Sequence, residues 1–271
     1  MLIQLMKKIS KPRLWMLLSV AVFCARPAVF SAQTTNRLTP IQQRIETQRQ
    51  RLASSETEER RDALMKLGAM KHPDASRAAL PALNDADPIV RITAAHAVEA
   101  LPPAEAAAAL IPLLADKQEV VRREAAHALG DTGSRTAVQP LIELLNTDKE
   151  AGVRSAAAIA LGQIRDEAAV VPLANVLSGG ATNKKKSKAR ENEFVMREAA
   201  QSLGQIRSRA GVAALIETLN NDANPVDVRR TAAEALGAIG DPTAATALKA
   251  ASESSDPYLS QMARASLRRL H

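Results

Sequence analysis

The stretch VRREAAHALGDTG, residues 121–133, places two arginines, a glutamate, a histidine and a glycine turn close together, as a small catalytic site could. The pattern recurs along the chain. Clear copies are VRSAAAIALG at 153–162, VMREAAQSLG at 195–204 and VRRTAAEALG at 228–237, and weaker copies are ERRDALMKLG at 59–68, VRITAAHAVE at 90–99 and LSQMARASLR at 259–268. A catalytic site is usually built once, whereas a structural unit is stacked many times. The stretch is therefore interpreted as a structural unit.

The copies follow one another at nearly regular intervals. Their second residues are separated by 31, 31, 32, 42, 33 and 31 positions; these residues are Arg60, Arg91, Arg122, Arg154, Met196, Arg229 and Ser260. The long interval contains a basic insertion at residues 178–193. We expect the recurring arginines to be structural and to bridge neighbouring repeats through acidic residues such as Asp87, Asp116 or Asp222. Met196 should interrupt that series.

Each repeat is predicted to contain two helices. In the first, Val121, Ala125 and Leu129 stand at i, i+4 and i+8, which is the apolar stripe of a helix. The second begins after residues whose side-chain oxygens can cap a helix, namely Ser134, Asp166, Ser208 and Asp241. Four of the second helices contain a proline that is expected to kink them, at Pro81, Pro112, Pro140 and Pro172.

The motif V-R-x-x-A-A-x-A-L-G, followed by a capped and often proline-bearing helix, resembles HEAT repeats of the short phycobilisome-lyase-like kind. The resemblance extends over residues 56–271. It implies an all-α fold, a right-handed α-solenoid of about seven helix pairs. Residues 32–55 are expected to form a linker and a helix, beginning at Thr39 and Pro40, that covers the open end of the first repeat.

Residues 1–31 have a different composition. Four basic residues precede an apolar run at 14–25, which is shorter than the roughly 20 residues that span a bilayer. This pattern is typical of a signal peptide cleaved near Ser31, so we expect a periplasmic or secreted protein. A retained membrane anchor at 14–32 is the alternative. The segment also holds the one cysteine, Cys24, so the exported chain would have no thiolate chemistry and no disulfide.

The net charge of +7 is unevenly distributed. Residues 1–31 contain five basic and no acidic residues, which leaves +2 for the remainder. The insertion adds five more positive charges, at Lys184, Lys185, Lys186, Lys188 and Arg190. This basic loop is interpreted either as a solvated segment or as a contact for an acidic partner or an anionic surface. Nucleic-acid binding is not expected, because Phe194 and Tyr258 are the sole aromatic residues after position 31.

The resemblance also suggests where a partner would bind. In solenoids of this family the helices with the VR motif line the concave face, so their outward residues would form a groove for a protein or peptide. These residues differ from repeat to repeat: Ile92, His96, Arg123, His127, Ile159, Arg197, Gln201, Arg230 and Glu234. A neutral exposed surface would show the same variation, and this alternative stays open.

No catalytic, cofactor or metal site is predicted. His96 and His127 occupy matching positions in adjacent repeats, but no third or fourth ligand accompanies them. The chain resembles deoxyhypusine hydroxylase in its helix pairs and lacks the His-Glu dipeptides of that enzyme. The phycobilisome lyases act on bilin proteins inside the cell or plastid, which conflicts with a signal peptide. We therefore expect a monomeric, non-catalytic scaffold that binds another protein or peptide; a HEAT-repeat enzyme with an unrecognised site is the alternative.

Overall fold

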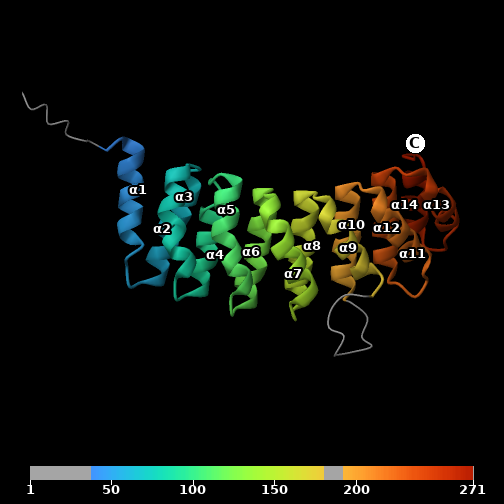
Figure 1. The fold of residues 1–271 in the computed structure, drawn as a ribbon, viewed down its shortest axis with the longest axis horizontal. Helices are drawn as coiled ribbons and strands as arrows, with labels where there is room; N and C mark the ends of the chain where they lie inside the picture. The colour runs from blue at the N-terminus through green and yellow to red at the C-terminus, as the bar shows by residue number, and fades with distance from the viewer. Residues whose placement is uncertain (1–37, 180–191, 271) are drawn as a thin grey trace, which may run out of the picture. The chain divides into compact units, whose positions relative to one another are not determined.

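The protein is built from helices that follow one another in two rows. The computed structural model describes residues 38–179 and 192–270, and no strand occurs among them. Contacts separate residues 1–37 from a unit formed by residues 38–271, and only this second unit is described here. Successive helix pairs run in chain order from α1 to α14 (Figure 1). The predicted all-α solenoid is confirmed.

Every copy of the sequence motif forms one helix of the first row, which we call the even row. Its members are α2 (Thr57–Ala69), α4 (Pro88–Ala97), α6 (Glu119–Thr132), α8 (Ala151–Ile164), α10 (Glu193–Ile206), α12 (Val226–Ile239) and α14 (Pro257–Leu267). Each helix contacts the next member of the row. The predicted stripe of α6 is buried, with Val121, Ala125 and Leu129 at most 1% exposed.

The other helices form the odd row, and most of them continue from or into a 3-10 helix. The α-helices are α1 (Pro40–Arg51), α3 (Pro73–Ala79), α5 (Pro103–Leu110), α7 (Val138–Thr147), α9 (Val170–Leu177), α11 (Val212–Asn220) and α13 (Ala245–Ala251). The 3-10 helices are η1 (Leu80–Asn84), η2 (Ile111–Ala115), η3 (Arg135–Ala137), η4 (Glu167–Ala169), η5 (Arg209–Gly211) and η6 (Pro242–Ala244).

Helix pairing is shifted relative to the sequence interpretation, which placed the VR helix first in each pair. Among the odd helices, each even helix packs mainly on the one that precedes it, as α8 does on α7 and α12 on α11. Helix α1 packs on α2 in the same way. It therefore completes the first pair, and it is largely polar, as a terminal helix of a stack should be. Thr39 and Gln42 form the reciprocal capping box that begins α1.

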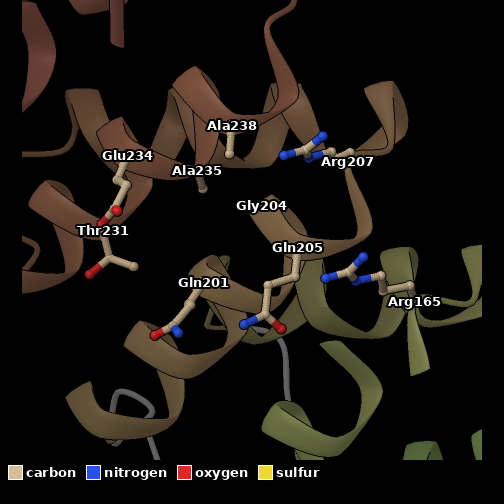
Figure 2. A pocket seen from close by; sticks show the side chains of 9 residues that line it. All are labelled: Arg165, Gln201, Gly204, Gln205, Arg207, Thr231, Glu234, Ala235 and Ala238. Atoms are coloured by element: carbon tan, nitrogen blue, oxygen red, sulfur yellow. The ribbon is translucent and has the colours of Figure 1, made fainter. Parts of the chain in front are cut away.

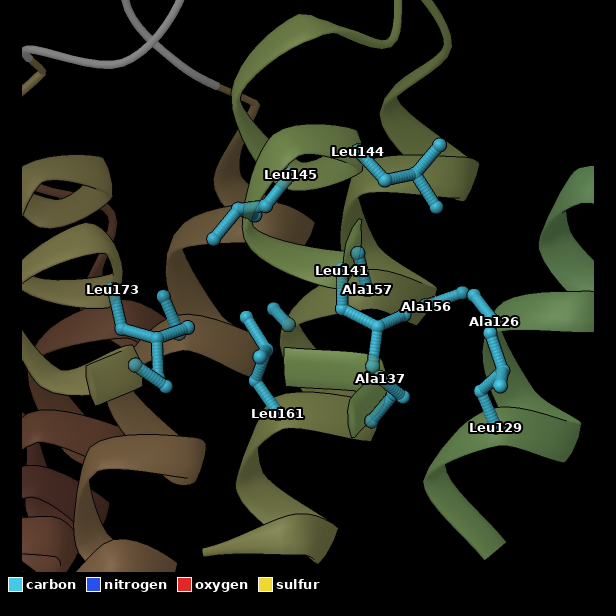
Figure 3. Packing of buried hydrophobic residues seen from close by; sticks show 14 of the residues in the cluster. Ala126, Leu129, Ala137, Leu141, Leu144, Leu145, Ala156, Ala157, Leu161 and Leu173 are labelled. Carbon is cyan, nitrogen blue, oxygen red and sulfur yellow. The ribbon is translucent and has the colours of Figure 1, made fainter. Parts of the chain in front are cut away.

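The core is a continuous layer of aliphatic side chains between the two rows. Leu141 and Leu145 of α7, Leu161 of α8 and Leu173 of α9 are completely buried (Figure 3). Burial of a leucine contributes roughly 1.5–3 kcal/mol. Since adjacent pairs share this layer, each repeat depends on its neighbours for stability.

The prolines do not interrupt α-helices in the predicted manner. Pro81 and Pro112 lie in η1 and η2, where the chain has already tightened to 3-10 geometry. Pro140 and Pro172 lie in the first turns of α7 and α9. A proline is tolerated near a helix start because its missing N–H would lack an intrahelical partner there. The expected position of these prolines in the interior of an α-helix was wrong.

Three of the four predicted capping residues cap a 3-10 helix. Asp166, Ser208 and Asp241 accept hydrogen bonds from backbone N–H groups of η4, η5 and η6. Ser134 does not, because its hydroxyl bonds to that of Thr136 instead.

The even helices approach closely because small residues meet at their contacts. A Cβ atom added at Gly204 would lie 2.9 Å from Ala235 Cα, and one at Gly130 would lie 2.8 Å from Ala160 Cα. Gly237 faces Ser266 in the same way. Contacts between neighbouring helices are more extensive in the even row than in the odd row.

Candidate functional site

Three of the five recurring arginines, Arg60, Arg91 and Arg122, bond to aspartates that precede the next even helix. Nε lies 2.7 Å from the carboxylate for Arg60 and Asp85, 2.8 Å for Arg91 and Asp116, and 2.6 Å for Arg122 and Asp148. All six side chains are at most 14% exposed. These three pairs, the arginine ladder, tie consecutive repeats together.

Each aspartate of the ladder also orders its own turn. The carboxylate of Asp116 accepts from the backbone N–H of Gln118, while its backbone carbonyl accepts from Arg122. Burial raises the pKa of the Asp116 carboxyl, but hydrogen bonds from Arg91 and Gln118 and the charges of Arg91 and Arg122 outweigh this and hold that pKa below its usual value. The pKa values of Asp85 and Asp148 are lowered for the same reasons.

The acidic partners of the recurring arginines agree only in part with those predicted from the sequence. Asp116 was predicted as a bridging residue, and this is confirmed. The first rung uses Asp85, while Asp87 caps α4 through the N–H of Ile89. Asp222 lies in the connection between α11 and α12 and pairs with Arg229 of α12, so it does not bridge two even helices. Met196 is buried at the equivalent position of α10.

The predicted partner-binding residues are distributed over five even helices, from α4 to α12. His96, Gln201 and Glu234 are exposed. Ile92, Arg123, His127, Ile159, Arg197 and Arg230 are partly exposed, and none of the nine is buried. The basic loop residues Lys184, Lys185, Lys186, Lys188 and Arg190 lie outside the described residues.

The three arginines of this surface differ in their partners. Arg123 and Arg197 bond to the adjacent Glu124 and Glu198 on the same helix. Arg230 bonds to Asp256 before α14 and lies 5.1 Å from the centre of the Tyr258 ring. Arg230 thus joins the last two repeats.

His96 lies near two carboxylates. Its Nδ1 is 3.0 Å from Glu99 Oε1, and its Nε2 is 3.8 Å from Glu124 Oε2 in the next repeat. The hydrogen bond to Glu99 and the nearby negative charges raise the pKa of His96, although partial burial opposes this. Over residues 38–179 and 192–270, no group of three His, Cys, Asp or Glu side chains has the arrangement of a metal site.

A pocket of about 360 Å³ opens on the even row between α10 and α12. Gln201 and Gln205 project from α10, Thr231 and Glu234 project from α12, and the small residues Gly204 and Ala235 leave the space between them (Figure 2). The remaining lining residues are Ala238, Arg165 and Arg207. Two of the nine predicted residues, Gln201 and Glu234, are brought together here.

The sequence interpretation missed Arg165 and Arg207. They end α8 and α10 with positive φ angles of 57° and 60°. Gly133 and Gly240 hold the same position after α6 and α12. An alignment of the repeats by their VR motifs would have shown that arginine stands at this position in two repeats and glycine in two others.

The repeats match a known family model described as HEAT repeats, over residues 45–122, 107–192 and 184–268. The chain belongs to the HEAT-repeat family. Among solved structures, this HEAT-repeat chain is similar to the complex of CpcE and CpcF of phycocyanin lyase from Nostoc sp. PCC7120, with 25% identity, a TM-score of 0.50, and 88% of this chain and 90% of the other covered.

Two further structures share the fold of this HEAT-repeat protein. The YibA protein of E. coli is 21% identical, with a TM-score of 0.57 and coverage of 84% of this chain and 82% of the other. An engineered protein is also 21% identical, with a TM-score of 0.51 and coverage of 83% and 67%. No curated protein matches the sequence. Among the helices in the described ranges, none has the length and apolar character needed to cross a bilayer.

Proposed function

We propose that this HEAT-repeat protein is a non-catalytic scaffold that binds another protein or peptide along the exposed face of the even row. The observation that carries the proposal is a contrast within each even helix. Packing positions such as Ala125 and Ala232 recur and are buried, whereas the outward positions are exposed or partly exposed and differ between repeats. A partner-specific surface needs a constant scaffold and variable contacts.

Two further observations favour this face over the odd row. Neighbouring helices contact each other more extensively in the even row than in the odd row. This supports the assignment of the even-row face as the concave side, which solenoids commonly use for binding. The pocket between α10 and α12 also opens on it. In the similar phycocyanin lyase structure, CpcE forms a complex with CpcF, which supports a protein as the partner.

The test is crosslinking in the native cell followed by capture of the full chain. The variant Arg123→Ala/Gln201→Ala/Glu234→Ala removes outward side chains of the even row and none of the buried ion pairs. Its matched control is Gln139→Ala/Glu143→Ala/Lys249→Ala, which removes an exposed amide, acid and base from the odd row. We expect one specific protein to be crosslinked by the parent and the control and lost with the even-row variant. Equal recovery with both variants would exclude this face.

We also propose that the protein is exported, because the basic residues before the apolar run at 14–25 suit a signal peptide. The native protein should then be found outside the cytoplasm with an N-terminus near residue 32, as determined by mass spectrometry of the purified chain. Recovery with residues 1–31 attached would instead favour the anchor.

A further inference from the structure

We propose that the pocket between α10 and α12 binds an acidic side chain of an extended peptide, with Arg165 and Arg207 holding the carboxylate. This inference deepens the proposed function and rests on it, since it names the chemistry of the partner segment. Arginine is not required by the fold at positions 165 and 207, because glycine occupies the equivalent position in two other repeats.

The conformation of these arginines is the first argument. A left-handed backbone is unfavourable for residues with a Cβ atom and is readily adopted by glycine. Gly133 and Gly240 occupy this position in two other repeats. Arginine therefore costs stability at positions 165 and 207, and these two positions flank the same pocket. Lys71 has the same conformation outside the pocket, so the backbone strain alone does not mark a site; Arg165 and Arg207 are distinguished by flanking one cavity.

The absence of internal partners is the second argument. Neither the Arg165 nor the Arg207 side chain makes an ion pair or hydrogen bond with another residue in the part of the chain that the structure describes. By contrast Arg135, in the turn after α6, and Arg209, two residues after Arg207, are paired with Asp166 and Asp241. Both pocket arginines are exposed and extend toward the space beside Gln205 and Ala238 (Figure 2). Two free guanidinium groups can bind a carboxylate through charge-assisted hydrogen bonds.

The rest of the lining suits a peptide. Glu234 is the one acidic residue among the lining residues, so the arginine end remains positively charged. The amide oxygen of Gln205 is buried beside Gly162 of α8 and has no hydrogen-bond partner in the described region, so a peptide would reach it only after rotation of this side chain. Gln201 and Thr231 add polar contacts on opposite helices.

The experiment is the selection of phage-displayed random nonapeptides against the purified parent chain. We expect the selected peptides to be enriched in Asp or Glu and to bind at least tenfold more weakly to the variant Arg165→Gly/Arg207→Gly. Because glycine relieves the backbone strain, the same variant should unfold at a higher denaturant concentration than the parent. Loss of binding could then not be attributed to misfolding.

The matched control is Lys71→Gly. Lys71 also has a positive φ angle, 46°, at the equivalent position after α2 and lies outside the pocket. This variant should gain stability and bind the selected peptides as the parent does. The proposal would be overturned if no peptide were selected, if the selected peptides were not enriched in acidic residues, or if the double-glycine variant bound them as well as the parent. Arginine-dependent binding of a single-stranded oligonucleotide in place of peptides would also overturn it. The crosslinking variant changes Gln201 and Glu234 of the same pocket, so the double-glycine variant is also crosslinked. Recovery of the same partner with this variant would overturn the arginine site and leave the even-row surface standing, whereas failure of the parent chain to capture any partner would overturn the proposed function itself.

Discussion

The Arg122 guanidinium of α6 bonds to the Asp148 carboxylate, with Nε 2.6 Å from Oδ2, and so joins α6 to the turn that begins α8. The two side chains are 10% and 6% exposed, and they are the most buried rung of the arginine ladder. Removing Arg122 would leave the buried Asp148 carboxylate without its direct ion pair, with only the nearby charge of Arg154 among the described residues.

We therefore expect Arg122→Met to lower the free energy of unfolding by about 3–5 kcal/mol, as is typical when one member of a buried pair is removed. Methionine keeps much of the aliphatic volume, which isolates the effect of the charge. Urea unfolding followed by circular dichroism provides the measurement. Arg77→Met is the matched control, because Arg77 also bridges repeats, to Glu105, but both side chains are more than a third exposed. The control should lose less than about 1 kcal/mol; equal losses would contradict a special role for the ladder.

The aspartates of the ladder predict acid sensitivity. The folded-state pKa values of Asp85, Asp116 and Asp148 lie below their ordinary values. Their contribution to stability is therefore fully present above the unfolded-state pKa, about 3.9, and is lost as the pH falls through the folded-state values. We expect the urea midpoint to fall steeply below about pH 4. Arg122→Met should show a shallower fall, since the Asp148 pKa would move toward its ordinary value. An unchanged pH profile in this variant would count against the assignment.

Close packing of α10 on α12 gives a third prediction. The Cβ atom of Gly204→Ala would lie 2.9 Å from Ala235 Cα, and overpacking costs about 1–3 kcal/mol. Alanine regains roughly 1 kcal/mol of helix propensity, so we expect a net loss of about 1 kcal/mol. Gly152→Ala in α8 is the control, because no atom lies within 4 Å of its added Cβ. The control should be neutral or stabilising in a thermal melt. A stabilised Gly204→Ala variant would show that the helices can separate freely.

His96 should titrate at a higher pH than an isolated histidine. Its hydrogen bond to Glu99 raises the pKa of the imidazole, so its stabilising effect is complete below the unfolded-state pKa of about 6.5 and is lost as the pH rises through the folded-state value. An NMR titration of the imidazole protons should give a midpoint above 6.5. Glu99→Gln should lower that midpoint, and an unchanged midpoint would mean that the contact is not formed in solution.

The helices of the even row were predictable because packing repeats the same residues in every copy. Val121, Ala125 and Leu129 have to be apolar to fill the shared core, and this leaves a periodic record in the sequence. The choice of which odd helix pairs with each even helix leaves no such pattern in the sequence. An apolar stripe shows that a helix is buried, but it does not show whether α8 rests on α7 or on α9.

Side-chain partners were less predictable than helices. Asp85 and Asp87 stand in the same turn, and only the direction of the Arg60 side chain decides which of them pairs with it. The pocket has a similar origin. Arg165 and Gln205 come from different repeats, and their convergence depends on how α8, α10 and α12 are stacked. The left-handed conformation of Arg165 was visible only by comparison with Gly133 in another repeat.

The shifted pairing of helices also bears on how such a chain can change its length. A segment that begins at Ser134 and ends with Arg165 contains η3, α7 and α8, and so it carries one complete pair with its own core contacts. Ala160 within it and Ser202 in the following repeat occupy the same position, each facing a glycine of the previous even helix. If this segment were lost or duplicated, the helices brought together would meet through the same faces that meet between repeats now. A break between α7 and α8 would instead expose Leu141 and Leu161. Gain or loss of whole pairs is therefore expected at boundaries that directly follow an even helix, where the new contacts repeat existing ones. A longer connection within a pair is a different change, as the insertion at residues 178–193 between α9 and α10 illustrates.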